Sequence, residues 1–255
     1  MVQEHAPVHS VEEIAPNIFQ LAFRSQKIAG QAEPGQFVNV KVEDARGPLL
    51  RRPFSIYAVD KDNVSIIFNV VGRGTKLLAE MAVGENLDVL GPLGRGVFPY
   101  KDDGFGTALL VAGGLGVAAL PFLNALIPIK KKRIAFLGAR TASQIVRSGL
   151  DPVHVATDDG SEGLHGTVVD LLGRFLKTAT VERPRIFSCG PLPMMRALKE
   201  FARDKSIECY LALEGEMACG IGLCQGCPVQ TIEGKKKFEL VCSDGPVFEA
   251  STVSF

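Results

Sequence analysis

The sequence has no excess of charge of either sign. Its 255 residues include 28 lysines plus arginines and 28 aspartates plus glutamates, which gives a formal net charge of zero at pH 7. Proteins that hold nucleic acid or an anionic membrane usually present a basic field over one surface. We therefore expect no nucleic-acid partner, and we interpret the basic run 130–133 as a solvated loop between a helix and a strand.

Histidine is scarce, and the four that occur show no pattern of a metal site. His5, His9, His154 and His165 are not paired at metal-ligand spacing, and no general base stands out elsewhere. We therefore expect no catalytic residue for oxidising a carbon substrate on this chain.

Signals for secretion or for spanning a membrane are also missing. Residues 1–16 have no apolar stretch behind a basic start, which predicts no secretory signal. Residues 104–129 carry no charge and are long enough to span a bilayer, but three central glycines, Pro121 and Pro128 interrupt them. A buried strand, a glycine turn and a buried helix explain this run better, so we expect a cytoplasmic protein without membrane contact.

The pattern of apolar and turn-forming residues changes twice along the chain. We therefore expect three parts: 1–103, 104–212 and 213–255. The first part has short β-branched runs separated by turns, such as 37–42 and 64–71, which predicts a small antiparallel β-barrel. The second part alternates apolar strands with helices, which predicts a parallel, doubly wound sheet with ligands beyond the carboxyl ends of its strands. Its predicted strands are 107–113, 133–139, 153–159 and 185–190, and its predicted helices are 117–127, 141–148, 166–177 and 191–204.

The third part holds four of the six cysteines. They follow the spacing C-x4-C-x2-C-x14-C and are Cys219, Cys224, Cys227 and Cys242. This is the spacing of plant-type [2Fe–2S] ligands, in which soft thiolates hold iron. The glycines between them leave room for backbone N–H groups to approach the cluster.

Two other interpretations of these cysteines are weaker. A zinc site usually closes with two short knuckles, whereas only one C-x2-C is present. Disulfides are disfavoured in a reducing cytosol. The two remaining cysteines, Cys189 and Cys209, are interpreted more simply as a loop residue and a small buried hydrophobe.

A glycine loop lies between the first predicted strand and helix of the second part. Gly114-x-Gly116-x-x-Ala119 fits the looser dinucleotide fingerprint, in which a turn brings backbone N–H groups to a pyrophosphate. The acidic ribose ligand expected about twenty residues later is missing, so a standard Rossmann dehydrogenase is not the best match. A buried strand–turn–helix corner would also favour these glycines.

Two features of the first part remain open between a binding and a structural role. Gly72 and Gly74 with Thr75 predict either an anion nest or an ordinary turn with Thr75 as helix N-cap. Arg51 and Arg52 predict either a phosphate clamp or a surface ion pair.

Together these stretches resemble the ferredoxin–NADP reductase superfamily over nearly the whole chain. Within it, "LEGEMACGIGLCQGCPV" followed by "VCSDGPVF" resembles the cluster segment of the electron-transfer subunits of class 1B dihydroorotate dehydrogenases. The resemblance implies an FAD-binding barrel, a pyridine-nucleotide domain and a C-terminal [2Fe–2S] segment, in that order.

The resemblance also implies roles for individual residues. "RPFS" is similar to the flavin motif, with Arg52 on the FAD pyrophosphate, Ser55 near the flavin N5, and Phe54 where many members have tyrosine. The implied FAD residues are Arg52, Pro53, Phe54, Ser55, Asn69, Val70, Val71, Gly74 and Thr75. The implied NAD residues are Gly113, Gly114, Gly116, Asp158, Cys189, Gly190 and Pro191.

These cofactors imply a mechanism. NAD exchanges electrons in pairs and a [2Fe–2S] cluster exchanges them singly, so a flavin that can do both must stand between them. The resemblance implies an FMN-containing catalytic subunit that oxidises dihydroorotate in pyrimidine synthesis, and a heterotetramer with it. Electrons would then pass from FMN through the cluster and FAD to NAD⁺.

An alternative within the same class is an FAD/[2Fe–2S] subunit that oxidises NAD(P)H in a hydrogenase or a ferredoxin–NADP reductase complex. A zinc-containing nucleotide sensor without turnover is a more distant alternative. The preference for NAD stays open as well, because Asp158 and Asp159 would repel a 2′-phosphate whereas Arg140 could attract one.

Overall fold

The computed structural model describes residues 1–42, 49–232 and 237–255. Its first part is a barrel-like sheet of antiparallel strands in the order β4-β3-β7-β1-β2-β6-β5, and β4 also contacts β6. The strands enclose an apolar interior that includes Phe23, Ile66 and Val89. The predicted antiparallel barrel is confirmed. Its elements are β1 (Val2–Ala15), β2 (Ile18–Arg24), α1 (Gln26–Ala29), β3 (Phe37–Lys41), β4 (Arg52–Ser55), β5 (Ala58–Asp60), β6 (Asn63–Asn69), α2 (Arg73–Ala79) and β7 (Asn86–Leu93).

The second part is a sheet in the order β11-β10-β9-β8-β12-β13-β16, whose pairs are parallel as far as β13. The chain starts at the central β8, adds strands on one side and then continues on the other, so the order reverses between β8 and β12. This is the doubly wound sheet that the strand–helix alternation predicted. Its elements are β8 (Thr107–Gly113), η1 (Gly114–Ala119), α3 (Pro121–Leu126), β9 (Lys132–Ala139), η2 (Ala142–Gln144), β10 (Val153–Thr157), β11 (Leu164–His165), α4 (Val168–Thr178), β12 (Pro184–Cys189), α5 (Leu192–Lys205) and β13 (Glu208–Ala212).

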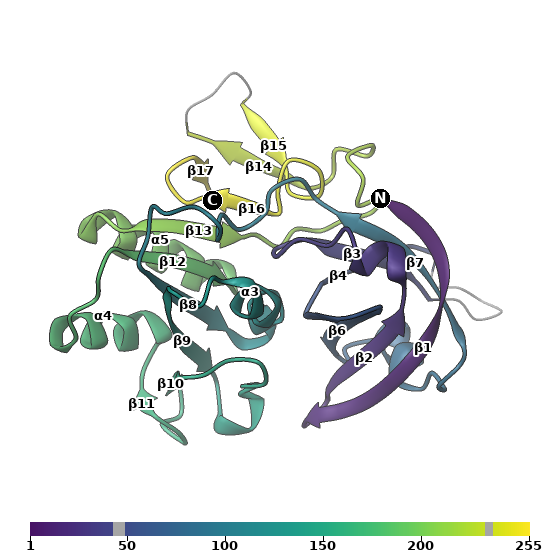
Figure 1. The fold of residues 1–255 in the computed structure, drawn as a ribbon, viewed down its shortest axis with the longest axis horizontal. Coiled ribbons are helices and arrows are strands. Elements are labelled where there is room, and N and C mark those ends of the chain that lie inside the picture. The colour runs from purple at the N-terminus through teal and green to yellow at the C-terminus, as the bar shows by residue number, and fades with distance from the viewer. Residues whose placement is uncertain (43–48, 233–236) are drawn as a thin grey trace.

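The cysteine-rich end of the chain lies across the other two parts (Figure 1). It forms a small antiparallel sheet from β14 (Pro228–Thr231), β15 (Phe238–Leu240) and β17 (Val253–Ser254). Its remaining strand, β16 (Val247–Glu249), pairs antiparallel with β13 and so becomes the edge of the second sheet. The cysteine-rich end is therefore built into the nucleotide sheet, which its composition did not indicate.

One hydrophobic cluster joins all three parts. It contains Phe37 and Leu93 of the barrel, Leu109 and Leu211 of the second sheet, and Val241 of the cysteine-rich end. A second cluster packs Ile18, Tyr57 and Ile67 of the barrel against the other face of the nucleotide sheet. Because apolar burial is the main stabilising contribution, these shared clusters hold the three parts in a defined arrangement.

Two predicted helices differ from the structure. Residues 141–148 form only the 3-10 turn η2, because the Ser161 hydroxyl accepts the Ala142 N–H at 2.8 Å and the Thr141 and Ser143 hydroxyls bond to each other. Such local hydroxyl bonds compete with helical ones. Residues 117–127 divide into η1 and α3 because Pro121, which lacks an N–H, begins a new helix.

Other departures are smaller. Lys131, expected in a solvated loop, is only 5% exposed, and its ammonium lies 3.5 Å from the Phe105 ring centroid. Strand β10 ends at Thr157 rather than at 159. Cys189, expected in a loop, is the buried last residue of β12.

A candidate nucleotide and flavin site joined to a cysteine loop

A cavity lies at the point where the second sheet reverses its strand order. It has a volume of about 760 Å³ and is lined by the ends of β8, β9, β10 and β12. Doubly wound sheets bind ligands at this point, beyond the carboxyl ends of the strands. We call it the strand-end cavity. It brings together six of the seven residues predicted for NAD: Gly113, Gly114, Gly116, Asp158, Gly190 and Pro191.

The glycines of this cavity are required by close contacts and by backbone conformation. A Cβ on Gly116 would lie 2.5 Å from the Cys189 carbonyl carbon, and one on Gly113 would lie 2.6 Å from the Met194 sulfur. Gly114 has φ of 52° and has open space where its Cβ would be. The loop can therefore offer bare backbone to a ligand, as a pyrophosphate requires.

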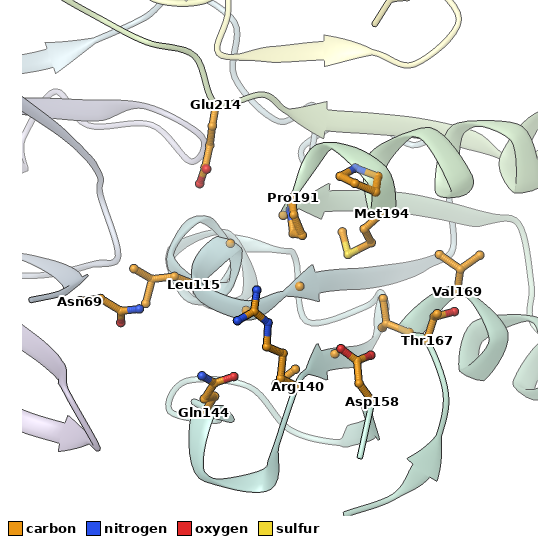
Figure 2. A pocket seen from close by; sticks show the side chains of 18 of the residues that line it. Asn69, Leu115, Arg140, Gln144, Asp158, Thr167, Val169, Pro191, Met194 and Glu214 are labelled. Carbon is orange, nitrogen blue, oxygen red and sulfur yellow. The ribbon is translucent and has the colours of Figure 1, made fainter. Parts of the chain in front are cut away.

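Charged side chains enter the strand-end cavity from opposite sides. Figure 2 shows Arg140 and Asp158 pointing into it from the ends of β9 and β10, and Glu214 pointing into it from the far side. Thr167, on the same wall, caps α4 by accepting the Asp170 N–H at 3.1 Å. The arrangement suits a ligand with hydroxyl groups at one end and a polar ring at the other.

A second cavity, of about 360 Å³, lies between the barrel and the second sheet. We call it the barrel cavity. Six residues predicted for FAD line it: Pro53, Phe54, Ser55, Asn69, Val71 and Thr75. Cys189, predicted for NAD, lines this cavity and not the larger one.

Three residues predicted for FAD lie outside the lining of the barrel cavity. Arg52 packs its guanidinium on Gly74, where an added Cβ would come within 2.8 Å of Nε. Val70 follows the end of β6 and packs against the barrel core. Arg52 and Gly74 therefore adjoin each other at the start of α2, beside the Thr75 that lines the cavity.

The open alternatives for this region are now resolved in part. Gly72, not Thr75, is the N-cap of α2, and the Thr75 hydroxyl accepts the N–H groups of Val71 and Gly72 at 2.9 and 3.2 Å. Arg51 forms an ion pair with Asp88 at 2.7 Å, but the two side chains are only 19% and 14% exposed, so the pair is half-buried rather than on the surface as predicted. Arg52 is instead directed to the start of α2.

The two cavities share Asn69, Leu115 and Glu214. The Asn69 Oδ1 atom is buried and has no hydrogen-bond partner among the residues that the structure describes. Since buried polar atoms are rarely left unpaired in a complete site, this acceptor fits a donor supplied by a ligand. The chain therefore fits two ligands in contact, one in each cavity.

Glu214 was not singled out from the sequence, although it begins the "EGEMACG" stretch before the first cluster cysteine. Glu214 is exposed by surface area and lines both cavities, and desolvation by the protein around its carboxyl raises the pKa of that group. The Cys189 sulfur lies 4.0 Å from its Oε1, and burial, followed by the Glu214 charge, raises the pKa of that thiol. Both groups are thus held in their protonated forms more readily than in water.

The four cluster cysteines lie together in two pairs. All four are free thiols. Within each pair one backbone N–H donates to the other residue's sulfur: Cys224 donates to Cys219 at 3.4 Å and Cys242 donates to Cys227 at 3.5 Å. The loop turns a further N–H toward sulfur, since Gly222 donates to Cys242 at 3.2 Å. Such donors stabilise thiolate and cluster charge.

The chemistry of the donor set bears on which group the loop could hold. All four side chains gathered there are cysteines, Cys219, Cys224, Cys227 and Cys242, and four thiolates are the ligand set of [2Fe–2S] clusters. The donor set therefore fits such a cluster.

The comparisons with known proteins agree with this construction. The family model for the iron–sulfur cluster binding domain of dihydroorotate dehydrogenase B matches residues 214–254, and the oxidoreductase FAD-binding domain matches residues 5–98. Among solved structures, the NADH-dependent reduced ferredoxin–NADP oxidoreductase of a study on flavin-based electron bifurcation superposes with a TM-score of 0.85 at 26% identity, covering 98% of this chain and 90% of that one. A ferredoxin–NADP⁺ reductase from Neisseria gonorrhoeae shares the fold at 15% identity and a TM-score of 0.63, covering 79% of this chain and 91% of that one.

The fold and the matched domains define the class as a flavin-dependent oxidoreductase with an iron–sulfur domain. The curated relatives are more specific. The "dihydroorotate dehydrogenase B (NAD(+)), electron transfer subunit" of Lysinibacillus sphaericus is 43% identical, covering 99% of this chain and 98% of that protein, and the one of Bacillus velezensis is 40% identical over the full length of both. The chain belongs to this family of electron transfer subunits.

No helix in the described part of the chain is long and apolar enough to cross a membrane.

Proposed function

We propose that the chain is the electron-transfer subunit of an NAD⁺-dependent dihydroorotate dehydrogenase in pyrimidine synthesis. One observation supports this: the strand-end cavity, the barrel cavity and the cysteine loop follow one another in the order that the chemistry requires. The barrel cavity adjoins the strand-end cavity through Asn69, Leu115 and Glu214, and its wall continues through Gly215 and Met217 toward Cys219. A flavin there would lie between a nicotinamide and the cluster cysteines.

The residues of the chain would hold and orient these groups. The residues that line the barrel cavity would bind FAD, with Arg52 and Gly74 at its phosphates. The glycine loop after β8 would hold the NAD pyrophosphate, with Asp158 on the adenosine side. When bound, FAD supplies exchange of electrons either singly or in pairs, and the [2Fe–2S] cluster supplies single-electron exchange.

We propose that a partner subunit with FMN oxidises dihydroorotate, since the curated relatives are named as electron transfer subunits. Dihydroorotate gives up two electrons and two protons to become orotate, and NAD⁺ takes up both electrons and one proton. The cysteine loop suits a docking surface, since Leu223, between Cys219 and Cys224, is 78% exposed, and exposed apolar side chains are common at such sites. A heterotetramer of two such subunits with two catalytic ones, in the cytoplasm where thiolate ligands stay reduced, completes the proposal.

Residues 213–255 remain our proposed bounds for the cluster segment, with 1–103 for the FAD-binding barrel and 104–212 for the nucleotide domain. The strongest alternative is a subunit that oxidises NAD(P)H for another partner, such as a hydrogenase, because the same three sites would serve it.

Anaerobic affinity purification of the chain from its native host, with mass spectrometry of co-eluting proteins, tests the proposal. We expect an FMN-type dihydroorotate dehydrogenase subunit, and a complex that reduces NAD⁺ when dihydroorotate is added. Co-elution of a hydrogenase subunit, with no dihydroorotate-dependent reduction of NAD⁺, would overturn the assignment but keep the cofactor sites.

A further inference from the structure

Strand β3 of the barrel contains one buried polar side chain among apolar ones. Asn39 is 1% exposed, and its neighbours Phe37, Val38 and Val40 are all buried. Its Nδ2 donates to the backbone carbonyl of Cys219 at 3.1 Å, while its buried Oδ1 has no hydrogen-bond partner in the described ranges of the chain. Burying an amide that is only half satisfied is costly, so the barrel itself gains little from an asparagine at this position.

The cysteine loop is shaped around this amide. Gly220 directly follows Cys219 and has φ of 70°, a conformation that favours glycine. A Cβ at Gly220 would overlap the Asn39 amide nitrogen. The backbone that carries Cys219 therefore packs against Asn39 with no room for a larger residue.

Asn39 is at the same time a neighbour of the barrel cavity. In the β3–β4 ladder it lies opposite Pro53, while Val38 lies opposite Phe54 and Phe37 opposite Ser55. Arg51, held by Asp88, also donates to the Asn39 carbonyl at 3.4 Å. The backbone of Asn39 is thus fixed to the strand that lines the proposed flavin site, and its side chain is fixed to a cluster ligand.

We propose that Asn39 is a positioning residue that holds the Cys219–Cys224 half of the cluster at a set place relative to the flavin. This inference rests on the proposed function, because it requires both cofactors. Removing a residue that orients a metal ligand through a hydrogen bond typically lowers metal affinity or activity by about 10- to 100-fold. Asn39 meets this description through the Cys219 backbone.

Asn39→Leu separates this role from a merely structural one. Leucine has a similar volume, suits a strand interior and removes the unpaired Oδ1, so we expect an unchanged or higher melting temperature and normal FAD content. We also expect loss of iron and sulfide on dilution to be faster by about 10- to 100-fold. The electron paramagnetic resonance spectrum of the reduced cluster should change, and electron transfer from NADH-reduced flavin to the cluster should slow.

Asn63→Leu is the matched control, because Asn63 is a half-buried asparagine at the end of β6 remote from the cavity-lining Asn69. It should leave the spectrum and the cluster lifetime as in the wild type. If Asn39→Leu fails to fold, Gly220→Ala gives a second test from the loop side, and it should alter the spectrum and the lifetime in the same direction.

The outcomes are distinguishable. A full-length wild type that binds neither FAD nor iron would overturn the proposed function and this inference with it. A loaded wild type together with an Asn39→Leu variant of identical spectrum, lifetime and transfer rate would overturn the inference alone. If the Asn39→Leu variant does not fold, a Gly220→Ala variant with the spectrum and cluster lifetime of the wild type would also overturn the inference alone.

Discussion

The glycine loop after β8 and the cysteine loop of residues 219–227 form their sites from different atoms. In the glycine loop the backbone is the wall of the cavity, and a side chain on Gly113 or Gly116 would collide with its neighbours. In the cysteine loop the sulfur atoms are the site, and the glycines let the backbone turn and, at Gly220, pack against Asn39. We therefore expect the first loop to be sensitive to added volume, and the second chiefly to replacement of a sulfur ligand.

The largest expected effect is on the cysteine loop. Cys224→Ser should abolish electron exchange with a catalytic partner, because oxygen replaces one thiolate of the Cys219–Cys224 pair, while NADH should still bleach the bound FAD. Visible absorbance, iron analysis and turnover in the reconstituted complex measure this. Cys209→Ala is the control, since Cys209 is a buried residue of β13 and not one of the four loop cysteines. Undiminished transfer in the Cys224→Ser complex would contradict the assignment of the cluster.

The glycine loop should respond to a single methyl group. In Gly116→Ala the new Cβ would meet the Cys189 carbonyl, which is backbone and cannot easily move. Because a displacement of about 1 Å near reacting groups can cost about 100-fold, kcat/KM for NADH should fall by roughly 10- to 100-fold while iron content stays normal. Steady-state kinetics measure the loss. Gly173→Ala in α4, where the nearest atom lies 3.4 Å away, should change neither, and a fully active Gly116→Ala would remove the glycine loop from the site.

A smaller effect concerns the choice between NAD and NADP. Asp158 lies on the wall of the strand-end cavity, so Asp158→Ser should relieve repulsion of a 2′-phosphate. We expect the ratio of kcat/KM for NADH over NADPH to fall by about tenfold, which corresponds to roughly 1.4 kcal/mol. The control is Asp159→Ser, because the Asp159 carboxylate is instead occupied by the Ser161 hydroxyl at 2.6 Å. An unchanged ratio in Asp158→Ser would mean that the ribose lies elsewhere.

The smallest expected effect is a pH dependence of stability. Burial raises the pKa of Glu214 above its ordinary value of 4.5, so in that range the folded chain binds more protons than the unfolded one. The stabilisation is present below 4.5 and is lost as the pH rises through the raised pKa. Melting temperatures of the ligand-free wild type should therefore fall over this window relative to Glu214→Gln, and parallel curves would refute the shift.

Several features were predictable because they depend on local pattern. The runs 107–113 and 185–190 became β8 and β12, since a continuous apolar run bounded by a glycine loop is typical of a buried parallel strand. The cysteine spacing indicated the cluster because it is also a local feature: three of the four proposed ligands lie within nine residues. The helix predicted over residues 141–148 was wrong because the Ser161 hydroxyl, which accepts the Ala142 N–H, lies in another loop and is not part of the local pattern.

The sequence alone determined the classes of cofactor and the two sheets, since ligand chemistry and side-chain periodicity are properties of neighbouring residues. The tertiary structure alone decided that Lys131 is buried, that β16 completes the second sheet, and that the cysteines form two pairs. It also brought Asn39 to Cys219 across 180 residues of chain. The physical reason is that such contacts depend on how separate apolar faces pack against each other. A local sequence pattern shows that a face is buried but not which other segment covers it.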